Sequence, residues 1–414
     1  MFVRNFFIYV FLFCTVFSSF AMVYDNRFIF LRERQLLYLN DKKHSVILDG
    51  FVATASEAVR NDETSSIPAL FGVFDFNHYV QAFVKAGHQN PLMPGETIPT
   101  TFIKPTAKMQ AQGVALSFYT PLFFQNWLSM GINSFFMRVN TFHDFRLDPS
   151  VDDYVRHMLH DVGLSRDQAT RYGFGDIDWC LRFGYERTHY FKFRSFNIGA
   201  RVGALVPTGK KRDISIPSSI PFGGNGHWGM YGALDGLFEV REDLKVGFLF
   251  RMSKRFPLTD RQRLPLQNEP GIFGVIAGNA RVNPGFTFVF SPMIAFENLR
   301  PGLGASLSYT MTKHLEDKWS DARSGACAIP HLLDGDPVVE NKKYIPVNLE
   351  QIEKLSSWGS DYFTLQVFYN FGTLEKDMQA EPIISFKWDI PVSLFVTDNI
   401  FKTHKISLGI ECAF

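Results

Sequence analysis

Two short glycine motifs are the first places in this sequence where chemistry could occur. Residues 207–211 (PTGKK) are similar to a phosphate-binding loop, but Lys211 stands where the loop needs Ser or Thr, and the spacing from Gly203 is wrong by one residue. Gly302 and Gly304 have the spacing that begins a dinucleotide fingerprint, but they lie on an expected strand that no helix follows. We therefore predict no cofactor.

Metal-ligating and nucleophilic residues are equally sparse. Asp334 and Asp336 could bind calcium, but the remaining ligands of a calcium loop are missing, which favours a solvated turn. A catalytic Ser needs a His within hydrogen-bond reach, and on a strand the pair would be two residues apart. None of the eleven His has that spacing, and His44 and Ser45 are adjacent, so they face opposite sides. We predict no metal site and no enzyme.

Charged residues that alternate with apolar ones are the stronger candidates for function. A lipid-facing Arg or Lys at mid-bilayer costs about 2–4 kcal/mol, so on membrane-spanning strands these residues must face the lumen of a barrel. There they could pair and fill the lumen, or they could line a path for a solute. The candidates are Asp178, Arg182, Glu186, Arg201, Asp235, Glu239, Lys245, Arg251, Glu297, Lys387, Asp389 and Glu411.

Strands of about 10 to 14 residues are the elements that would position these side chains. In residues 361–371, Phe363, Leu365 and Val367 face one way, while Thr364 and Gln366 face the other. The same alternation recurs near 177–185, 245–253, 303–311 and 405–414. Strands of this length cross a bilayer at a tilt, whereas strands of globular proteins average about five or six residues.

About twelve such strands are expected in an all-β, antiparallel transmembrane barrel, with fourteen as the alternative if residues 271–282 hold another hairpin. Long connections alternate with short ones, as extracellular loops alternate with periplasmic turns in outer-membrane barrels. Residues 75–86 and 152–160 have a helical period and predict helices over the barrel mouth, or a plug or lid in the lumen. The expected strands are residues 43–53, 109–119, 127–137, 175–190, 195–206, 227–240, 244–256, 285–297, 301–312, 360–371, 382–396 and 403–414.

The two ends of the chain carry patterns that are typical of secretion and of outer-membrane assembly. Arg4, an apolar run and the small-x-small site at Ser19 and Ala21 predict a signal peptide over residues 1–21. Residues 22–42 would form a periplasmic segment or a plug, and residues 43–414 the barrel. Phe414 ends an alternating strand, which is similar to the assembly signal of outer-membrane proteins. We therefore predict the cell outer membrane as the location, with outer-membrane lipid and the barrel-assembly machinery as partners.

One segment resembles a known family. Residues 173–179 (GFGDIDW) and 199–210 (GARVGALVPTGK) resemble the outer-membrane transporters for long-chain fatty acids and aromatic hydrocarbons, including those of meta-pathway phenol degradation. The resemblance covers only about residues 173–211. It implies a barrel that takes up apolar solutes. The fatty-acid transporters carry a long N-terminal hatch before the first strand, whereas only about twenty residues are available here.

These observations predict a channel for passive uptake of small apolar or amphipathic solutes. The net charge of +1 gives no electrostatic reason to bind nucleic acid. Inward charges of both signs argue against an ion-selective porin, which would use rings of one sign. The alternatives are a structural or surface-interaction barrel without transport and, with less support, an enzyme of the outer-membrane phospholipase type.

Overall fold

The computed structural model describes most of the chain after its N-terminal region. The described residues are 27–28, 44–72, 74–88, 102–103, 106–122, 127–144, 149–164, 168–190, 193–266, 269–323, 346–373 and 381–414. The expected signal peptide and most of the segment before the first strand lie outside them, as does the Asp334–Asp336 turn.

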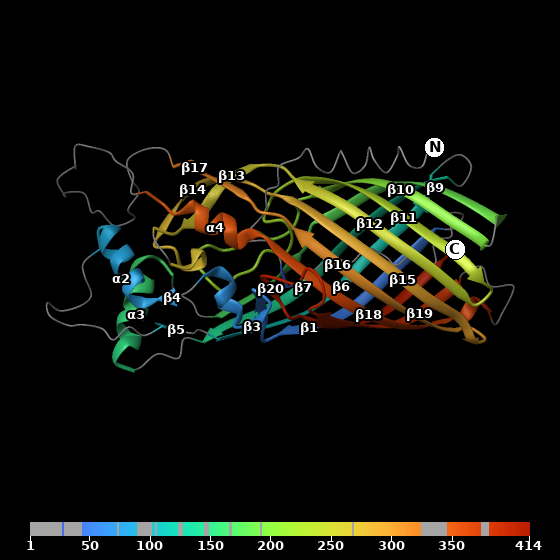
Figure 1. The fold of residues 1–414 in the computed structure, drawn as a ribbon, viewed down its shortest axis with the longest axis horizontal. Helices are drawn as coiled ribbons and strands as arrows, with labels where there is room; N and C mark the ends of the chain where they lie inside the picture. Colours follow the sequence, from blue (N-terminus) through green and yellow to red (C-terminus); the bar gives the residue numbers. More distant parts are fainter. Residues whose placement is uncertain are drawn as a thin grey trace.

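A closed antiparallel barrel of twelve strands forms the described part of the chain, as the sequence predicts (Figure 1). The first wall strand pairs with the last, from Ser45 opposite Ala413 to Thr54 opposite His404, and this pairing closes the wall. The wall strands are β1 (Ser45–Ala55), β6 (Thr106–Pro121), β7 (Leu128–Asp144), β9 (Ile177–Tyr190), β10 (Phe193–Val206), β11 (Gly229–Arg241), β12 (Leu244–Arg255), β15 (Phe286–Arg300), β16 (Leu303–His314), β18 (Trp358–Asn370), β19 (Glu381–Val392) and β21 (His404–Ala413).

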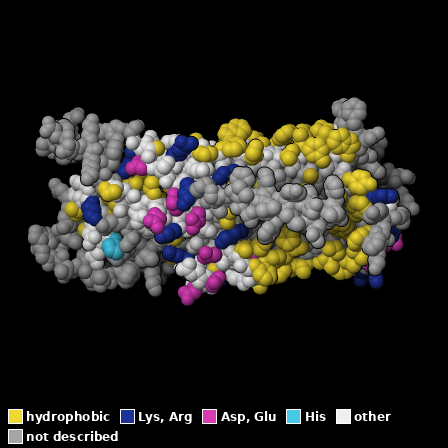
Figure 2. Space-filling model, turned by 45° about the horizontal axis from the view of Figure 1, so that its top comes forward, with side chains coloured by type: hydrophobic (Ala, Val, Ile, Leu, Met, Phe, Trp, Pro, Cys, Tyr) yellow, Lys and Arg dark blue, Asp and Glu magenta, His cyan; other side chains and the backbone are white. Residues whose placement is uncertain are grey.

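The outward side chains of this wall are apolar and exposed. On β21, Ile406, Leu408 and Ile410 are 49%, 60% and 48% exposed, whereas Ser407 and Glu411 on the other face are buried. Figure 2 shows hydrophobic side chains gathered over one part of the barrel, with Lys, Arg, Asp and Glu beyond them. An apolar band around a closed sheet is the surface that lipid covers. No helix among the described residues is long and apolar enough to span a membrane.

Smaller elements form a cap at the end of the barrel that carries the long loops, which is the extracellular end in barrels of this kind. One short helix, η4 (Phe371–Thr373), instead lies in a short turn. The cap elements are β2 (Ala58–Arg60), β3 (Glu63–Ser65), η2 (Ile67–Phe71), β4 (Phe74–Asp75), α2 (Phe76–Lys85), β5 (Phe102–Ile103), α3 (Pro149–Asp161), β13 (Leu258–Leu264), η3 (Gly271–Phe273), β14 (Ile276–Asn283), β17 (Lys318–Asp321), α4 (Leu349–Ser356) and β20 (Ile400–Phe401).

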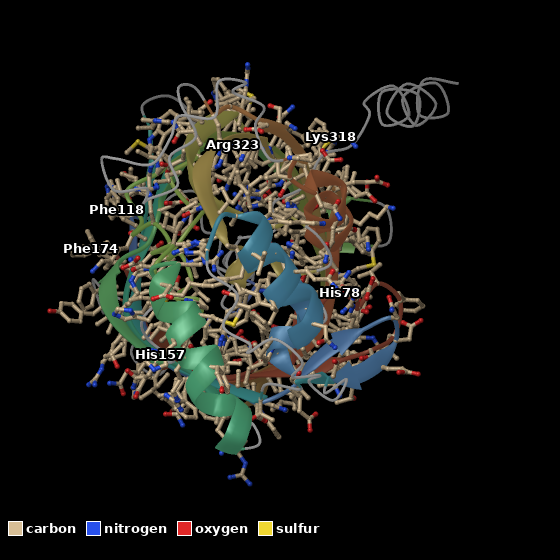
Figure 3. All side chains as sticks on the ribbon, turned by 90° about the vertical axis from the view of Figure 1, so that its left-hand side faces the viewer. His78, Phe118, His157, Phe174, Lys318 and Arg323 are labelled. Atoms are coloured by element: carbon tan, nitrogen blue, oxygen red, sulfur yellow. The ribbon has the colours of Figure 1, made fainter. Side chains whose placement is uncertain are left out.

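Both expected helices are confirmed as parts of this cap. They lie across the end of the barrel when it is viewed along its length (Figure 3). Tyr79 and Phe83 of α2 and Met158 of α3 are buried in one apolar cluster that also includes Phe71 and Ile272. The helices therefore close the mouth of the barrel through their apolar faces.

The fourteen-strand alternative is wrong, because the additional hairpin is not part of the barrel wall. A hairpin does form around residues 271–282, but it is the β13–β14 pair, which joins β17 in a separate sheet. The wall passes directly from β12 to β15, with Phe250 opposite Phe290. The extra hairpin therefore belongs to the cap.

A break in one wall strand is the second difference from the sequence-based expectation. Strand β8 (Gln168–Phe174) and strand β9 both pair with β7, one beyond the other, so together they occupy a single position in the wall. The chain bends between them at Gly175 and Asp176, where the Gly175 amide donates to the Phe135 carbonyl. Strands β6 and β7 therefore extend further towards the cap than the strands that the sequence predicted at residues 109–119 and 127–137.

Candidate functional site

The most deeply buried ion pairs of the lumen lie on β9, β10 and β11. Arg182 donates from Nη2 to the Asp235 carboxylate at 2.7 Å, and Arg201 donates from Nε to the same carboxylate at 3.0 Å. These three side chains are each at most 4% exposed. Arg182 also donates to Asn197 at 2.7 Å. The strands place them together because residues two apart on a strand share a face and neighbouring strands are in register.

A second ion pair lies above this group, towards the cap. Arg251 on β12 donates to Asp178 on β9 at 2.9 Å, and the Tyr231 hydroxyl donates to the other carboxylate oxygen at 2.6 Å. The Arg251 guanidinium lies 3.6 Å from the centroid of the Tyr231 ring. Asp178 is thus held by two donors, and Arg251 by a carboxylate and an aromatic face.

Asp176 organises the segment that resembles the hydrocarbon transporters. Its carboxylate accepts from the amides of Gly209 and Gly224 at 3.0 and 2.8 Å and pairs with Arg255 at 2.8 Å. A Cβ at Gly223 would lie 2.3 Å from the Asp176 carboxyl carbon, so only glycine fits there. Gly209 of the motif, together with Gly223, therefore allows a loop to fold down onto Asp176.

The remaining predicted charges lie nearer the periplasmic rim. Glu239 accepts from Ser195 at 2.7 Å and lies 3.5 Å from Arg194, and Glu297 pairs with Lys245 at 2.7 Å. Glu186 is exposed. The Glu239–Arg194 pair contributes little to stability, because the Arg194 side chain is 47% exposed.

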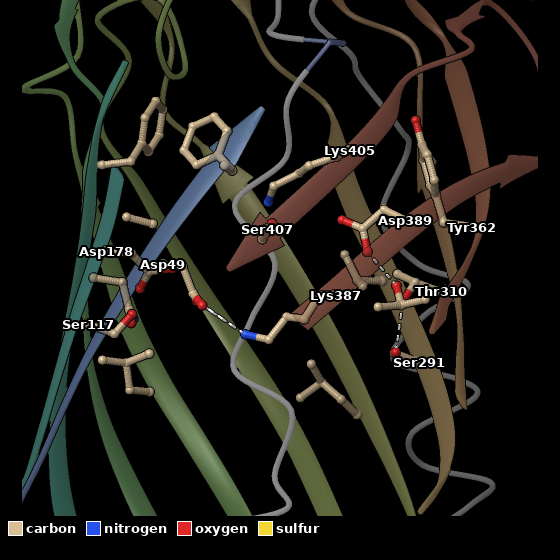
Figure 4. Close-up of a pocket in the computed structure, with 18 of the residues that line it drawn as sticks. Asp49, Ser117, Asp178, Ser291, Thr310, Tyr362, Lys387, Asp389, Lys405 and Ser407 are labelled. Carbon is tan, nitrogen blue, oxygen red and sulfur yellow. Dashed lines mark hydrogen bonds and ion pairs between the residues drawn. The ribbon is translucent and has the colours of Figure 1, made fainter. Parts of the chain in front are cut away.

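The opposite wall of the lumen is lined mainly by hydroxyl groups. Ser291 and Thr310 lie 2.9 Å apart, and Thr364 donates to Asp389 at 2.8 Å (Figure 4). The same wall carries the ion pair of Lys387 with Asp49, at 3.2 Å. Further hydroxyl groups that line this wall come from Ser308, Thr312, Tyr362, Ser385 and Ser407.

A cavity of about 310 Å³ separates the two walls. Towards the cap it is bounded by Phe51, Phe135 and Phe222, which belong to the apolar cluster of the mouth. Towards the periplasm it reaches Ile383, which packs with Phe368 in a smaller apolar cluster. The cavity therefore has polar and charged groups along its length and touches an apolar cluster at each end.

The structure places the predicted lumen residues in three groups. Asp178, Arg251 and Lys387 line the cavity, as do Asp389 and Glu411. Arg182, Arg201 and Asp235 lie buried against the wall in ion pairs, and Glu186, Glu239, Lys245 and Glu297 lie nearer the rim. Because the charges pair along the wall, they leave open more of the lumen than the sequence led us to expect.

Sequence reasoning missed the hydroxyl wall and Asp49. The signal was present, because Ser and Thr occupy the inward positions of the expected strands at 285–297, 301–312 and 360–371. It was overlooked because uncharged hydroxyl residues also occur on the solvated face of soluble sheets. Asp49 lies in the first strand, opposite Gly409, where glycine leaves room for its carboxylate.

Arg27 and Phe28 lie inside the cap although they precede the first strand. Arg27 is 1% exposed and donates to the carbonyls of Asn399 and Leu355 at 3.0 and 2.8 Å. Phe28 packs against Phe401, with ring centroids 6.4 Å apart. These two residues are therefore held at the extracellular end, whereas His44 lies at the periplasmic end beside Phe414.

No protein-family model matches the chain, and no curated protein matches it in sequence. Among solved structures, an outer membrane channel from Pseudomonas putida F1 aligns over 93% of this chain and 100% of its own, at 10% identity and a TM-score of 0.52. A mutant of the monoaromatic hydrocarbon channel TodX covers 95% and 99% at 10% identity and a TM-score of 0.36. A Pseudomonas aeruginosa FadL homologue covers 96% and 98% at 7% identity and a TM-score of 0.32.

The first likeness confirms the fold, and with the closed wall and its exposed apolar side chains it defines the class of protein. The chain is an outer-membrane β-barrel.

Proposed function

We propose that this barrel is a channel for passive uptake of a small amphipathic or apolar solute. The observation that carries the proposal is the cavity of about 310 Å³ inside the lumen, which has polar groups along its length and touches an apolar cluster at each end. Small-molecule sites are mostly apolar cavities of about 300–1,000 Å³ with a few polar groups, so this one suits a small solute. The P. putida structure with the same fold is named an outer membrane channel.

The charges of the lumen favour a neutral solute. Asp178 pairs with Arg251, Asp176 with Arg255, and Asp49 with Lys387, so these charges cancel locally. A channel selective for one kind of ion would instead present a ring of one sign. Hydroxyl groups such as those of Ser291 and Thr310 can both donate to and accept from a polar group on the solute.

We further propose that Arg27 and Phe28 act as part of a plug. Both residues are buried in the cap, and the hydrogen bonds from Arg27 reach the carbonyl oxygens of α4 and of the last long loop. In this state the apolar cluster closes the mouth, and a solute must displace part of it. Replacing Arg27 and Phe28 together by Ala should therefore raise the rate of uptake.

The test is a flux assay in liposomes that contain the purified barrel. A small apolar or small polar probe should enter, whereas a large hydrophilic oligosaccharide should not. Ser407→Phe places a ring in the cavity and should remove most of the flux. Leu408→Phe is the matched control, because Leu408 is the next residue on β21 but faces lipid and is 60% exposed. Loss of flux in both variants, or in neither, would count against the channel.

A structural barrel without transport is the second candidate, supported by the buried Arg182–Asp235–Arg201 group. It predicts no flux of any probe and a loss of stability when Asp235 is replaced. A hydrolase is less well supported. The Thr287 hydroxyl lies 2.6 Å from Nδ1 of His314, but that ring is 2% exposed and lies against Trp358. We therefore propose transport rather than hydrolysis.

A further inference from the structure

Three cations lie near one another on the outward face of the wall, beyond its apolar band. Lys108 on β6, Arg138 on β7 and Lys210 in the loop after β10 are all exposed. Gln112 is opposite Arg138 in the β6–β7 pairing, and Arg138 is opposite Tyr172 of β8. Lys210 lies 5.6 Å from the centroid of the Tyr172 ring. We refer to Lys108, Arg138, Tyr172 and Lys210 as the outer-leaflet patch.

Strand geometry places the outer-leaflet patch at the surface of the outer leaflet. Arg138 is ten residues beyond Leu128, where β7 begins at a periplasmic turn. At about 3.3 Å per residue and a tilt of about 40°, Arg138 lies about 25 Å above that rim, which is the height of the apolar band of such barrels. Lys108 is four residues beyond Gln112 and therefore lies about 10 Å further out.

Aromatic side chains lie beside these cations. Phe174 and Tyr172 are 64% and 65% exposed, and Phe142, opposite Lys108, is 43% exposed. Phe174 lies on the outer side of the wall in Figure 3. Aromatic residues of this kind mark the boundary between the apolar band and the headgroups. The patch therefore offers apolar surface to acyl chains and positive charge to the headgroup above them.

Within the described part of the chain, no partner neutralises the charges of Lys108 on β6 and Arg138 on β7. Their backbones pair in the sheet, but among the described residues neither the Lys108 nor the Arg138 side chain has a hydrogen bond or an ion pair. The Lys210 ammonium is bound only through the Tyr172 carbonyl, at 3.4 Å, and the face of its ring, within the described part of the chain. In contrast, most charges of the lumen are paired. Unpaired cations at the headgroup level of a membrane protein attract anionic lipid headgroups.

We propose that the outer-leaflet patch binds the phosphates of a glycolipid of the outer leaflet. The guanidinium of Arg138 can donate two parallel hydrogen bonds to one phosphate. Lys108 lies about 13 Å along the strand from the level of Arg138, so the pair suits a headgroup with more than one phosphate. The proposal does not depend on transport, since it concerns the outer surface of the wall.

The test measures lipid binding to the intact barrel by native mass spectrometry, with bisphosphorylated lipid A as the probe. Wild-type protein should retain the lipid. Lys108→Gln with Arg138→Gln should weaken binding on the order of 30-fold, since two basic residues near a membrane surface are lost. Arg138→Lys with Lys108 intact should bind more weakly than the wild type but more tightly than the double variant, because Lys keeps the charge and loses the two parallel hydrogen bonds. Lipid A without phosphates should not bind.

The matched control is Arg241→Gln with Arg300→Gln. Both residues are exposed cations at the periplasmic ends of strands β11 and β15, so the change in net charge is the same. This control should bind lipid A as the wild type does. Equal binding by the patch variant and the control would overturn the proposal. Equally tight binding of phosphatidylglycerol and lipid A would overturn the assignment to a glycolipid.

Discussion

The Asp235 carboxylate lies 2.7 Å from Nη2 of Arg182 across the intervening strand β10, and both side chains are almost fully buried. Asp235 also accepts from Arg201, so one carboxylate neutralises two guanidinium groups. Removal of one member of a buried ion pair leaves an uncompensated charge, which is more costly than the loss of a surface pair.

Asp235→Asn should therefore destabilise the barrel by about 3–5 kcal/mol. Glu239→Gln, four residues further along β11, should cost about 1 kcal/mol or less because its partner Arg194 is 47% exposed. Urea titration in detergent, with heat-modified mobility as the readout of folded protein, measures both. Similar losses for the two variants would show that Asp235 has no special role in the wall.

A buried carboxyl in the cap predicts a dependence on pH. Burial raises the pKa of Glu269 from 4.5 to about 8, although its Oε1 accepts from the Leu266 amide at 2.6 Å. The hydroxyl of Tyr79 on α2 lies in the same field: the Glu269 charge raises the pKa of Tyr79, and the Arg263 charge of β13 lowers it. Because the folded cap holds the proton more tightly than the unfolded one, its stability is greatest below about pH 4.5 and falls as the pH rises through 8.

Glu269→Gln should abolish this dependence. Limited proteolysis of the segment between β13 and η3, at several values between about pH 5 and pH 9, measures the stability of the cap. Wild-type protein should be cut faster as the pH rises, after correction for the protease itself. The Gln variant should be cut at a constant corrected rate, and parallel curves for the two proteins would argue against titration of Glu269.

The carboxylate of Asp361 fixes the last long loop against the outside of the wall. It accepts from the amides of Phe395, Val396 and Thr397 at 2.9–3.0 Å, and the Tyr309 hydroxyl donates to its other oxygen at 2.5 Å. Asp361→Ala should release this loop and cost about 1–3 kcal/mol, because the amides of residues 395–397 would lose their acceptor. Faster amide hydrogen exchange at residues 394–397 would confirm that the loop is released. Unchanged exchange at these residues would contradict this role of Asp361.

Phe414 completes the seam between the first and last strands. Its backbone exchanges hydrogen bonds with His44 at 2.9 and 3.0 Å, and its ring is 54% exposed. Deletion of Phe414 should lower the amount of folded, heat-modifiable protein in the outer membrane. Phe414→Tyr, which keeps an aromatic ring at the end, should assemble normally. Normal assembly of the deletion variant would remove this residue from the assembly signal.

The sequence by itself determined the barrel, since lipid and lumen impose opposite demands on alternate residues. Ile406, Leu408 and Ile410 had to face lipid, and Ser407 and Glu411 the lumen, so period-two alternation was sufficient to find β21. The helical period around Tyr79 and Met158 was likewise sufficient to find α2 and α3, because an apolar stripe predicts a buried face wherever the helix docks.

Only the tertiary structure decided which charges meet and how much of the lumen stays open. Asp178 and Arg251 are 73 residues apart, and Asp49 and Lys387 are 338 apart, so their pairing depends on barrel closure and strand register. Neither barrel closure nor strand register can be predicted from the alternation of residues along a single strand. The same register collects hydroxyl groups from separate strands into one wall, which is why the cavity could not be recognised before the strands were paired.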